Sequence, residues 1–373
     1  EQAVLTGGAN SNSLDASGFA GSVTLWGLDG NDTLLGAAGD DLLDGGPGTD
    51  QLRQTINKDQ VLIDSQVTGM GTDALSSIEQ GRLTGGIDGN TLDASGFSNS
   101  VTLWGVDGDD TLWGAASDDF LDGGDGNDQV RQTIDANQVL SDSQLTGWGT
   151  DSLLSIEEGQ LTGGVNANSL DASAFSGNVT LSGLDGDDTL RGAAGDDLID
   201  GGLGTDQVRQ TVDADQVLTD SQLTGMGTDA LSNVEQAQLT GGIDDNTLDA
   251  SGFSGNVTLR ALGGDDTLWG AAGDDLLDGG IGTDQVRQVV NSDQVLTDSQ
   301  LIGMGTDALS NIEEAQLTGG IDDNTIVASD FTLGPVTLAG DDGDDTLYGS
   351  SNSDVLDGGL GTDQIRQAID ANQ

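Results

Sequence analysis

The residues best suited to chemistry in this sequence are aspartates that recur on glycine-rich turns. Three consecutive nine-residue units run from Gly27 to Arg53, and each has Asp at its sixth position and Leu at its eighth. These aspartates are Asp32, Asp41 and Asp50. Glycine permits the positive φ of a tight turn, and carboxylate oxygens placed there are hard ligands for a divalent cation. The flanked leucine predicts a three-residue strand with one inward side chain.

These units belong to a longer internal repeat. Asp32, Asp110, Asp188 and Asp266 follow one another at intervals of 78 residues, and Asp345 follows after 79. The chain therefore divides into copies at 1–78, 79–156, 157–234 and 235–312, and a truncated fifth copy at 313–373. Tandem repeats of this kind form solenoids in which each unit contacts its neighbours. Because the chain begins and ends in mid-pattern, we interpret it as one continuous solenoid cut from a longer protein.

The unit at 45–53, Gly-Gly-Pro-Gly-Thr-Asp-Gln-Leu-Arg, fits the pattern G-G-x-G-x-D-x-U-x at every specified position. The first two units depart from it at the second glycine, where they have Leu28 and Ala37. The pattern resembles the hemolysin-type calcium-binding repeat, or RTX nonapeptide, which forms parallel β-helices. The resemblance implies an all-β fold, a parallel β-roll or β-helix solenoid, that binds multiple Ca²⁺ ions.

Cutting a copy into half-turns predicts four coils of 18–22 residues per 78-residue repeat, and hence about 19 coils in the chain. One copy should rise by roughly 19 Å, since adjacent strands lie about 4.8 Å apart. The core should be a narrow aliphatic ladder. In the first copy its expected members are Leu14, Leu25, Leu34, Leu43, Leu52, Val61, Leu75 and Leu83.

Half-turns alternate between two edges, so each turn should stack on the turn two units away. On one edge of the fourth copy the expected order is Asn246, Asp266, Asp284 and Asp307, followed by Asn324. A calcium ion between two stacked turns would take one carboxylate from each turn. Main-chain carbonyls of the glycine loops would complete the six to eight oxygens that Ca²⁺ prefers.

The candidate metal ligands follow from this stacking. The strongest expected pairs are Asp32 with Asp50, Asp110 with Asp128, Asp188 with Asp206, Asp266 with Asp284, and Asp345 with Asp363. On the opposite edge we expect Asp41 with Asp59, Asp197 with Asp215, and Asp275 with Asp293, and two weaker pairs with one charge fewer, Asp119 with Asn137 and Asp354 with Asn372. The remaining candidates are Asp73, Asp151, Asp229 and Asp307 in the seventh unit, and Asn90, Asn168, Asn246 and Asn324 in the first.

Turn capping is the alternative explanation for these residues, because Asp and Asn often cap turns. Capping accounts for a single turn. It does not account for stacked carboxylates, which repel each other without a cation in a chain whose net charge is already −56. We therefore expect calcium to be required for folding and chelation to unfold much of the chain.

Composition excludes several classes of function. With 9 Lys plus Arg against 65 Asp plus Glu, the chain should repel nucleic acid and anionic membranes. No apolar run approaches the length of a membrane span. The sequence has no Cys and no His, and every carboxylate pair recurs in several copies, whereas a catalytic centre is normally unique. We predict that the protein is not an enzyme, and the calcium requirement predicts an extracellular or cell-surface location.

Cationic and aromatic side chains also recur at fixed positions. The ninth residue of the third unit is Arg53, Arg131, Arg209, Arg287 or Arg366, and one coil earlier stand Leu35, Trp113, Arg191, Trp269 and Tyr348. Three of these five steps predict a guanidinium stacked on an aromatic ring. The arginines are explained by a simple structural role, in which their side chains cover the flank of the solenoid. The outward Trp26, Trp104, Trp113 and Trp269 suggest either the same cover or a contact with another copy or a surface polysaccharide.

We interpret the protein as a calcium-stabilised structural segment of a surface layer, sheath or filament that self-associates into fibres or sheets. Its repeat type and architecture resemble oscillin-like surface-fibril proteins of gliding filamentous bacteria. The alternatives are an RTX export or folding module of a secreted toxin, protease or epimerase, and the extender of an adhesin. Ice binding is a further alternative, suggested by Thr49, Thr205, Thr283 and Thr362, a row that Asn127 interrupts.

Overall fold

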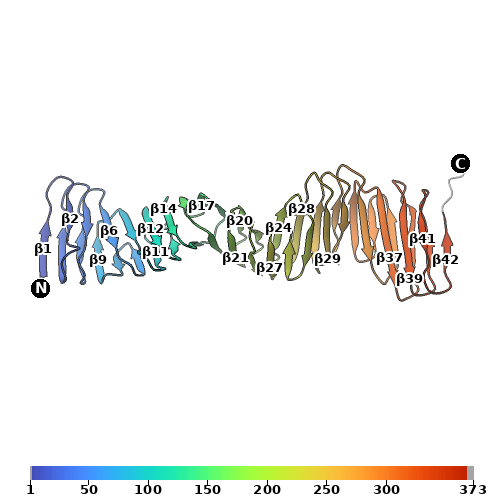
Figure 1. The fold of residues 1–373 in the computed structure, drawn as a ribbon, viewed down its shortest axis with the longest axis horizontal. Helices are drawn as coiled ribbons and strands as arrows, with labels where there is room; N and C mark the ends of the chain where they lie inside the picture. Colours follow the sequence, from blue (N-terminus) through green and yellow to red (C-terminus); the bar gives the residue numbers. More distant parts are fainter. Residues whose placement is uncertain (1, 368–373) are drawn as a thin grey trace. The chain divides into compact units, whose positions relative to one another are not determined.

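A computed structural model describes residues 2–367 of the chain (Figure 1). The described residues form strands and turns only, and they contain no helix that could span a membrane. The chain divides into two units, Glu1–Ser182 and Gly183–Gln373. Within each unit successive strands alternate between two mainly parallel ladders. The expected class, an all-β solenoid of the β-roll type, is confirmed.

The first unit contains two ladders, A and B, in which each strand pairs with the next one named. Ladder A consists of β1 (Gln2–Thr6), β3 (Ser22–Trp26), β5 (Leu42–Asp44), β9 (Thr72–Ser76), β8 (Gln66–Thr68), β7 (Gln60–Ile63), β11 (Thr91–Gly96), β13 (Thr111–Trp113), β15 (Gln129–Thr133) and β19 (Glu158–Gly164). Ladder B consists of β2 (Ser13–Asp15), β4 (Thr33–Leu35), β6 (Gln51–Thr55), β10 (Gln80–Thr84), β12 (Val101–Asp107), β14 (Phe120–Asp125), β18 (Thr150–Leu154), β17 (Gln144–Thr146), β16 (Gln138–Ser141) and β20 (Ser169–Ala174). Strand β21 (Asn178–Asp185) contains the boundary between the units.

The second unit contains ladders C and D. Ladder C consists of β23 (Leu198–Leu203), β27 (Thr228–Ser232), β26 (Gln222–Thr224), β25 (Gln216–Thr219), β29 (Thr247–Gly252), β31 (Thr267–Trp269), β33 (Gln285–Val289), β37 (Glu314–Gly320), β39 (Val336–Asp341) and β41 (Val355–Asp357). Ladder D consists of β22 (Thr189–Arg191), β24 (Gln207–Thr211), β28 (Gln236–Thr240), β30 (Asn256–Arg260), β32 (Leu276–Asp278), β36 (Thr306–Ser310), β35 (Gln300–Ile302), β34 (Gln294–Thr297), β38 (Thr325–Asp330), β40 (Thr346–Tyr348) and β42 (Gln364–Arg366).

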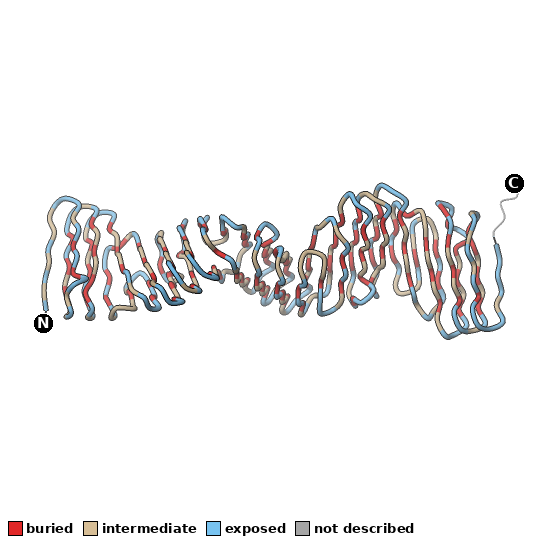
Figure 2. Tube along the Cα trace, in the orientation of Figure 1, coloured by how far each residue is buried: buried red, intermediate tan, exposed pale blue. Residues whose placement is uncertain are grey.

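The core consists of one or two inward side chains per strand, stacked in register along each ladder. Leu14, Leu34 and Leu52 are aligned across β2, β4 and β6 and are buried. Figure 2 shows this as short buried segments that alternate with exposed ones along the coils between the two end strands. Stacking removes the leucines from water, and each backbone group pairs with the coil above or below.

An antiparallel meander replaces one simple half-turn in each of the first four copies. In the first copy, β7 pairs antiparallel with β8 and β8 pairs antiparallel with β9, all within ladder A. The sequence explains the reversal, because the two-residue turn Asp64–Ser65 sends the chain back along the same sheet instead of across to the other. Residues that the sequence assigned to two separate half-turns therefore occupy one.

The meander changes the number of coils. The second copy crosses between ladders along β10, β11, β12, β13, β14 and β15 and then forms the β16–β17–β18 meander, which makes 7 half-turns, or three and a half coils. The expectation of four coils per copy, and with it about 19 coils in total, is corrected. An odd number of half-turns also moves equivalent strands to the opposite ladder, so β4 lies in ladder B and its equivalent β13 in ladder A.

The meander also shifts the inward register by one residue. Val61 was expected in the core but is 40% exposed, whereas Leu62 and Gln60 are fully buried. A slip of one residue exchanges the two faces of a strand. The Gln60 amide donates to the carbonyls of Ile56 and Thr84, so this polar side chain closes the end of the aliphatic core.

Candidate metal centre

The structure stacks the five strongest expected pairs of aspartates on adjacent turns. In each pair the peptide N–H of the first Asp donates to Oδ1 of the second. The distances are 2.6 Å for Asp32 to Asp50, 2.8 Å for Asp110 to Asp128, 2.7 Å for Asp188 to Asp206, 2.8 Å for Asp266 to Asp284, and 3.0 Å for Asp345 to Asp363. The 18-residue spacing of the aspartates therefore places both carboxylates of each pair at one edge of the fold.

Glutamate continues this series beyond the second Asp. The N–H of Asp50 donates to Oε2 of Glu79 at 2.9 Å, and the same bond joins Asp128 to Glu157, Asp206 to Glu235, and Asp284 to Glu313. The sequence placed Asp307 after Asp284, so that expectation was wrong. The recurrence of a Glu 29 residues after each second Asp was the signal that could have identified these side chains.

The pairs on the opposite edge differ from those expected. Asp41 stacks with Asp73, not with Asp59, and the N–H of Asp41 donates to Oδ1 of Asp73 at 3.0 Å. The equivalent pairs are Asp119 with Asp151, Asp197 with Asp229, and Asp275 with Asp307. The meander causes the change, because it places β9 beside β5, in the position that the sequence assigned to β7.

The expected second-edge partners contact residues near the start of the next copy instead. Asp59, Asn137, Asp215 and Asp293 accept hydrogen bonds from the peptide N–H groups of Thr91, Ser169, Thr247 and Thr325. Asp354 accepts from the N–H of Val336 and from the side chains of Ser350 and Gln367. Its expected partner Asn372 lies outside the described residues.

The turns fall into two classes, according to whether a side-chain oxygen of the Asp or Asn accepts a hydrogen bond from a peptide N–H of the same turn. In closed turns, Oδ2 accepts a hydrogen bond from the peptide N–H four residues earlier, as Asp41 does from Ala37. Asp119, Asp197 and Asp275 accept in the same way from Ala115, Ala193 and Ala271. Asn90 and its equivalents Asn168, Asn246 and Asn324 accept at Oδ1 from Gly86, Gly164, Gly242 and Gly320.

In eight of the open turns, Oδ2 of the aspartate is buried and has no hydrogen-bond partner. This holds for Asp32, Asp50, Asp110, Asp128, Asp206, Asp266, Asp284 and Asp345. The second residue of each open turn has positive φ, for example +72° at Leu28 and +91° at Gly46. Its counterpart Ala37 in the closed turn does not. Positive φ reorients the peptide that would otherwise donate to Oδ2 and so leaves that oxygen available to a cation.

Main-chain carbonyl oxygens converge on the same places. A Cβ atom built on Gly27 would lie closer than 3.0 Å to both Asp32 Oδ2 and the carbonyl oxygen of Gly45. One built on Gly45 would lie 2.6 Å from Asp50 Oδ2 and still closer to the carbonyl oxygen of Ser77. Each open turn thus has a space at its first glycine that is bordered by a carboxylate oxygen and a main-chain carbonyl oxygen. We call this space the cradle.

The electrostatics of these carboxylates also favour a cation. Burial, together with neighbouring aspartates, raises the pKa of Asp110 and Asp284 to about 6. Burial is again the main cause where the pKa rises to about 7 at the closed-turn partners Asp73, Asp151, Asp229 and Asp307. A nearby cation reverses such shifts because it stabilises the ionised form.

The oxygens present fit calcium. Among residues 2–367 no three side chains of Asp, Glu, His or Cys gather closely enough to hold a metal by themselves. Ligation in the open turns therefore has to combine carboxylates with main-chain carbonyls, and Ca²⁺ accepts such mixed all-oxygen sets. An unpartnered buried carboxylate oxygen is costly, and calcium would remove that cost.

The expected cation–π contacts are present on the flanks. The guanidinium carbon of Arg131 lies 4.6 Å from the ring centroid of Trp113, that of Arg287 4.5 Å from Trp269, and that of Arg366 5.0 Å from Tyr348. A fourth contact, with Arg82 3.7 Å from Trp104, was not expected. It arises because β10 and β12 are paired neighbours in ladder B.

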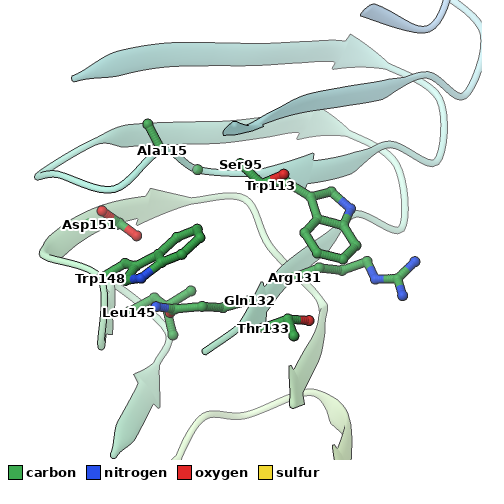
Figure 3. A pocket seen from close by; sticks show the side chains of 10 residues that line it. Ser95, Trp113, Ala115, Arg131, Gln132, Thr133, Leu145, Trp148 and Asp151 are labelled. Atoms are coloured by element: carbon green, nitrogen blue, oxygen red, sulfur yellow. The ribbon is translucent and has the colours of Figure 1, made fainter. Parts of the chain in front are cut away.

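A cavity of about 140 Å³ lies beside the meander of the second copy. Figure 3 shows Trp113, Trp148 and Asp151 around it, with Gln132 and Leu145 next to Trp148. Trp113 therefore borders a hollow and also stacks with Arg131, instead of standing free on the surface. In the fourth copy Trp269 and Met304 border the equivalent cavity.

The fold and the open turns define a β-solenoid with repeated oxygen-rich cation sites. The family described as "RTX calcium-binding nonapeptide repeat (4 copies)" matches residues 17–52, 102–130, 173–208, 251–286 and 337–365. These segments contain the open turns of all five copies. The chain therefore carries RTX calcium-binding nonapeptide repeats, and calcium is its cofactor.

Two further comparisons add little. No curated protein matches the chain. Among solved structures, it is similar to a hyperactive, Ca²⁺-dependent, β-helical antifreeze protein from an Antarctic bacterium. The identity is 18%, the match covers 91% of this chain and 83% of the other, and the TM-score is 0.19. A likeness at this level carries no functional argument.

Proposed function

We propose that this chain is a calcium-stabilised structural segment of an extracellular or cell-surface assembly, such as a surface layer, sheath or filament. The observation that carries the proposal is repetition. Two open turns with stacked aspartates occur in every copy, and no copy adds a different functional cluster among the described residues. For the same reason we assign the chain no catalytic role.

Calcium chemistry supports the location. Open turns built from two carboxylates and main-chain carbonyls resemble the weaker class of calcium site, which fills at the millimolar concentrations found outside cells. RTX repeats in general are typical of secreted proteins. The buried carboxylates would repel one another wherever calcium is scarce.

Exposed apolar side chains on the turns support self-association. Ile87 and Val165 in the first unit, and Ile243, Ile281 and Ile321 in the second, are all more than two-thirds exposed. Ile87, Val165, Ile243 and Ile321 recur at one position in successive copies, so they offer repeated contact points to another chain. Lateral contacts between chains would cover them.

Electron microscopy in millimolar calcium and in chelator tests this proposal. We expect fibres or sheets in calcium, with an axial spacing near the rise of one copy, about 17 Å for three and a half coils. Chelation should dissolve them. Separate short particles in calcium would instead favour an export or folding module, or an adhesin extender that serves a neighbouring domain.

A polysaccharide contact is a secondary proposal, located at the cavity beside Trp113 and Trp148. Two indole rings and a carboxylate form a suitable surface for a sugar ring. Replacing Trp148 with Met, the residue at the equivalent Met304, should weaken retention on surface polysaccharide without unfolding the chain. Equal retention of both proteins would contradict this proposal.

The geometry does not favour ice binding. Thr205 precedes β24 in ladder D, Thr283 precedes β33 in ladder C, and Thr362 precedes β42 in ladder D. These threonines therefore lie alternately on opposite edges of the second unit and form no common row. Thermal hysteresis in calcium would be the measurement that reopens this alternative.

A further inference from the structure

One open turn differs from its equivalents at its first residue. In the other copies this residue is a glycine, and its missing side chain leaves the cradle free. The first position of the first open turn is Gly27, Gly105, Gly183 and Gly340 in four copies, but Ala261 in the fourth. This turn carries Asp266, which stacks with Asp284. The substitution therefore falls beside one of the five aspartate pairs.

The glycine at this position leaves space for two oxygens. A Cβ atom built on Gly105 would lie closer than 3.0 Å to both Asp110 Oδ2 and the carbonyl oxygen of Gly123. The same overlap would occur at Gly27, Gly183 and Gly340. Because non-bonded carbon and oxygen atoms do not approach so closely, a methyl group and this arrangement of oxygens exclude each other.

The backbone around Ala261 keeps the usual pairing. Its N–H donates to the carbonyl of Asp278 at 2.9 Å, as the N–H of Gly27 donates to the carbonyl of Asp44 at 2.8 Å. The methyl group consequently points into the same space, and Ala261 is fully buried. The Asp266 carboxylate and the Gly279 carbonyl must therefore withdraw from the positions that their counterparts occupy.

The preceding residue adds a second difference. Arg260 stands in β30 where the equivalent residues are the uncharged Trp26, Trp104, Ser182 and Ala339. It is the cross-strand neighbour of Asp278. A positive charge next to the turn lowers the negative potential that attracts Ca²⁺, so both differences act in the same direction.

We propose that the calcium site between Asp266 and Asp284 is weaker than its counterparts, so that the fourth copy is the last to bind calcium and the first to release it. Ala261 is the residue that sets this order. As calcium falls, the turns around Ala261 lose their cation while the other copies still hold theirs. This inference rests on the proposed assignment of calcium to the open turns.

Calcium titration of the full chain by isothermal calorimetry tests the proposal, with Ala261→Gly as the key variant. We expect this variant to tighten the weakest binding step by about tenfold, because it restores the glycine of the other copies. Gly105→Ala is the matched control, and it should create a second weak step. Hydrogen exchange at falling calcium should show β30 and β32 losing protection before β12 and β14.

The outcomes are separable. An unchanged isotherm for Ala261→Gly, with calcium still bound, would overturn this inference and leave the calcium assignment standing. Loss of protection in the second copy before the fourth would overturn it as well. Absence of calcium binding in the native chain would overturn both. The Ala261→Gly result does not depend on whether Gly105→Ala folds, because the former removes a methyl group and adds none.

Discussion

The open turns and the closed turns that contain aspartate have it at the same position but present it differently. In the open turn, the Oδ2 atom of Asp110 is buried without a partner, whereas in the closed turn Oδ2 of Asp119 accepts the N–H of Ala115. The conformation of the second residue separates them, with φ of +96° at Val106 and no positive φ at Ala115. A single backbone dihedral thus decides whether a carboxylate is satisfied by the protein or left for a cation.

The largest effect that follows from this comparison is the loss of structure on chelation. Each open-turn pair that releases calcium leaves unpartnered buried carboxylates that repel one another. At a hundredfold excess over its dissociation constant, calcium contributes about 2.7 kcal/mol per site. Circular dichroism should show that strong chelator removes a large part of the β signal and lowers the melting temperature of the structure that remains, and that both recover when calcium returns. A spectrum that does not change would contradict the role of the open turns.

Matched Asp→Asn substitutions sharpen the comparison in one copy. Asp128→Asn should lower stability only in calcium, because Asn still accepts the N–H of Asp110 while the lost charge weakens the ion site. Asp119→Asn should cost about 1–3 kcal/mol with or without calcium, because its amide cannot accept both the Val101 and the Ala115 N–H groups. Urea unfolding in calcium and in chelator measures both. Equal calcium dependence of the two variants would remove the distinction.

The pH dependence of the calcium-free chain reports mainly on the partners of the closed-turn aspartates. Burial raises the folded-state pKa of Asp73, Asp151, Asp229 and Asp307 to about 7, above an unfolded value of about 3.9. Between these values the folded chain holds protons that the unfolded chain has released. Stability is therefore greatest below the unfolded pKa and falls as pH rises through about 7.

Denaturant melts of the calcium-free chain at about pH 5 and pH 8 test that sign. We expect the higher unfolding free energy at the lower pH. In saturating calcium the trend should weaken or reverse, because protons compete with calcium for the carboxylates of the open turns. A calcium-free chain that gains stability as pH rises would contradict the assigned shifts.

The smallest expected effect concerns the φ dihedral of the second residue in the turn. Val106 has a β-branched side chain at φ +96°, which is a strained conformation. Val106→Gly should therefore stabilise the calcium-bound chain by about 1 kcal/mol. Ala115→Gly is the control at an ordinary φ and should destabilise by about 0.5–1 kcal/mol. Thermal melts that shift in the same direction for both variants would show that the two turns do not differ in strain.

The sequence predicted the fold class and the stacked pairs of the open turns because both depend on periodicity. Nine-residue spacing fixes the inward Leu34, and two units of nine residues place Asp50 next to Asp32. These features need no knowledge of individual dihedrals. The five strongest pairs were therefore found at the correct residue numbers.

The remaining errors arise where periodicity fails. Asp64–Ser65 reverses the chain within one sheet, and this moves Asp73 to the edge opposite the one predicted and leaves Glu79 as the partner of Asp50. The two turn classes were also hidden, since Leu28 and Ala37 both replace the second glycine and only Leu28 takes positive φ. Leu, Val and Asp all take positive φ at this position of the open turns, so residue type alone does not identify the class.

The most direct test of the account is to locate calcium in crystals by anomalous scattering. Anomalous peaks are expected between Asp110 and Asp128 and at the equivalent open-turn pairs, each within reach of a glycine carbonyl. No peak is expected between Asp119 and Asp151, because the Oδ2 atom of Asp119 already accepts the N–H of Ala115. Ions at the closed-turn pairs, or open-turn pairs without ions in millimolar calcium, would contradict it.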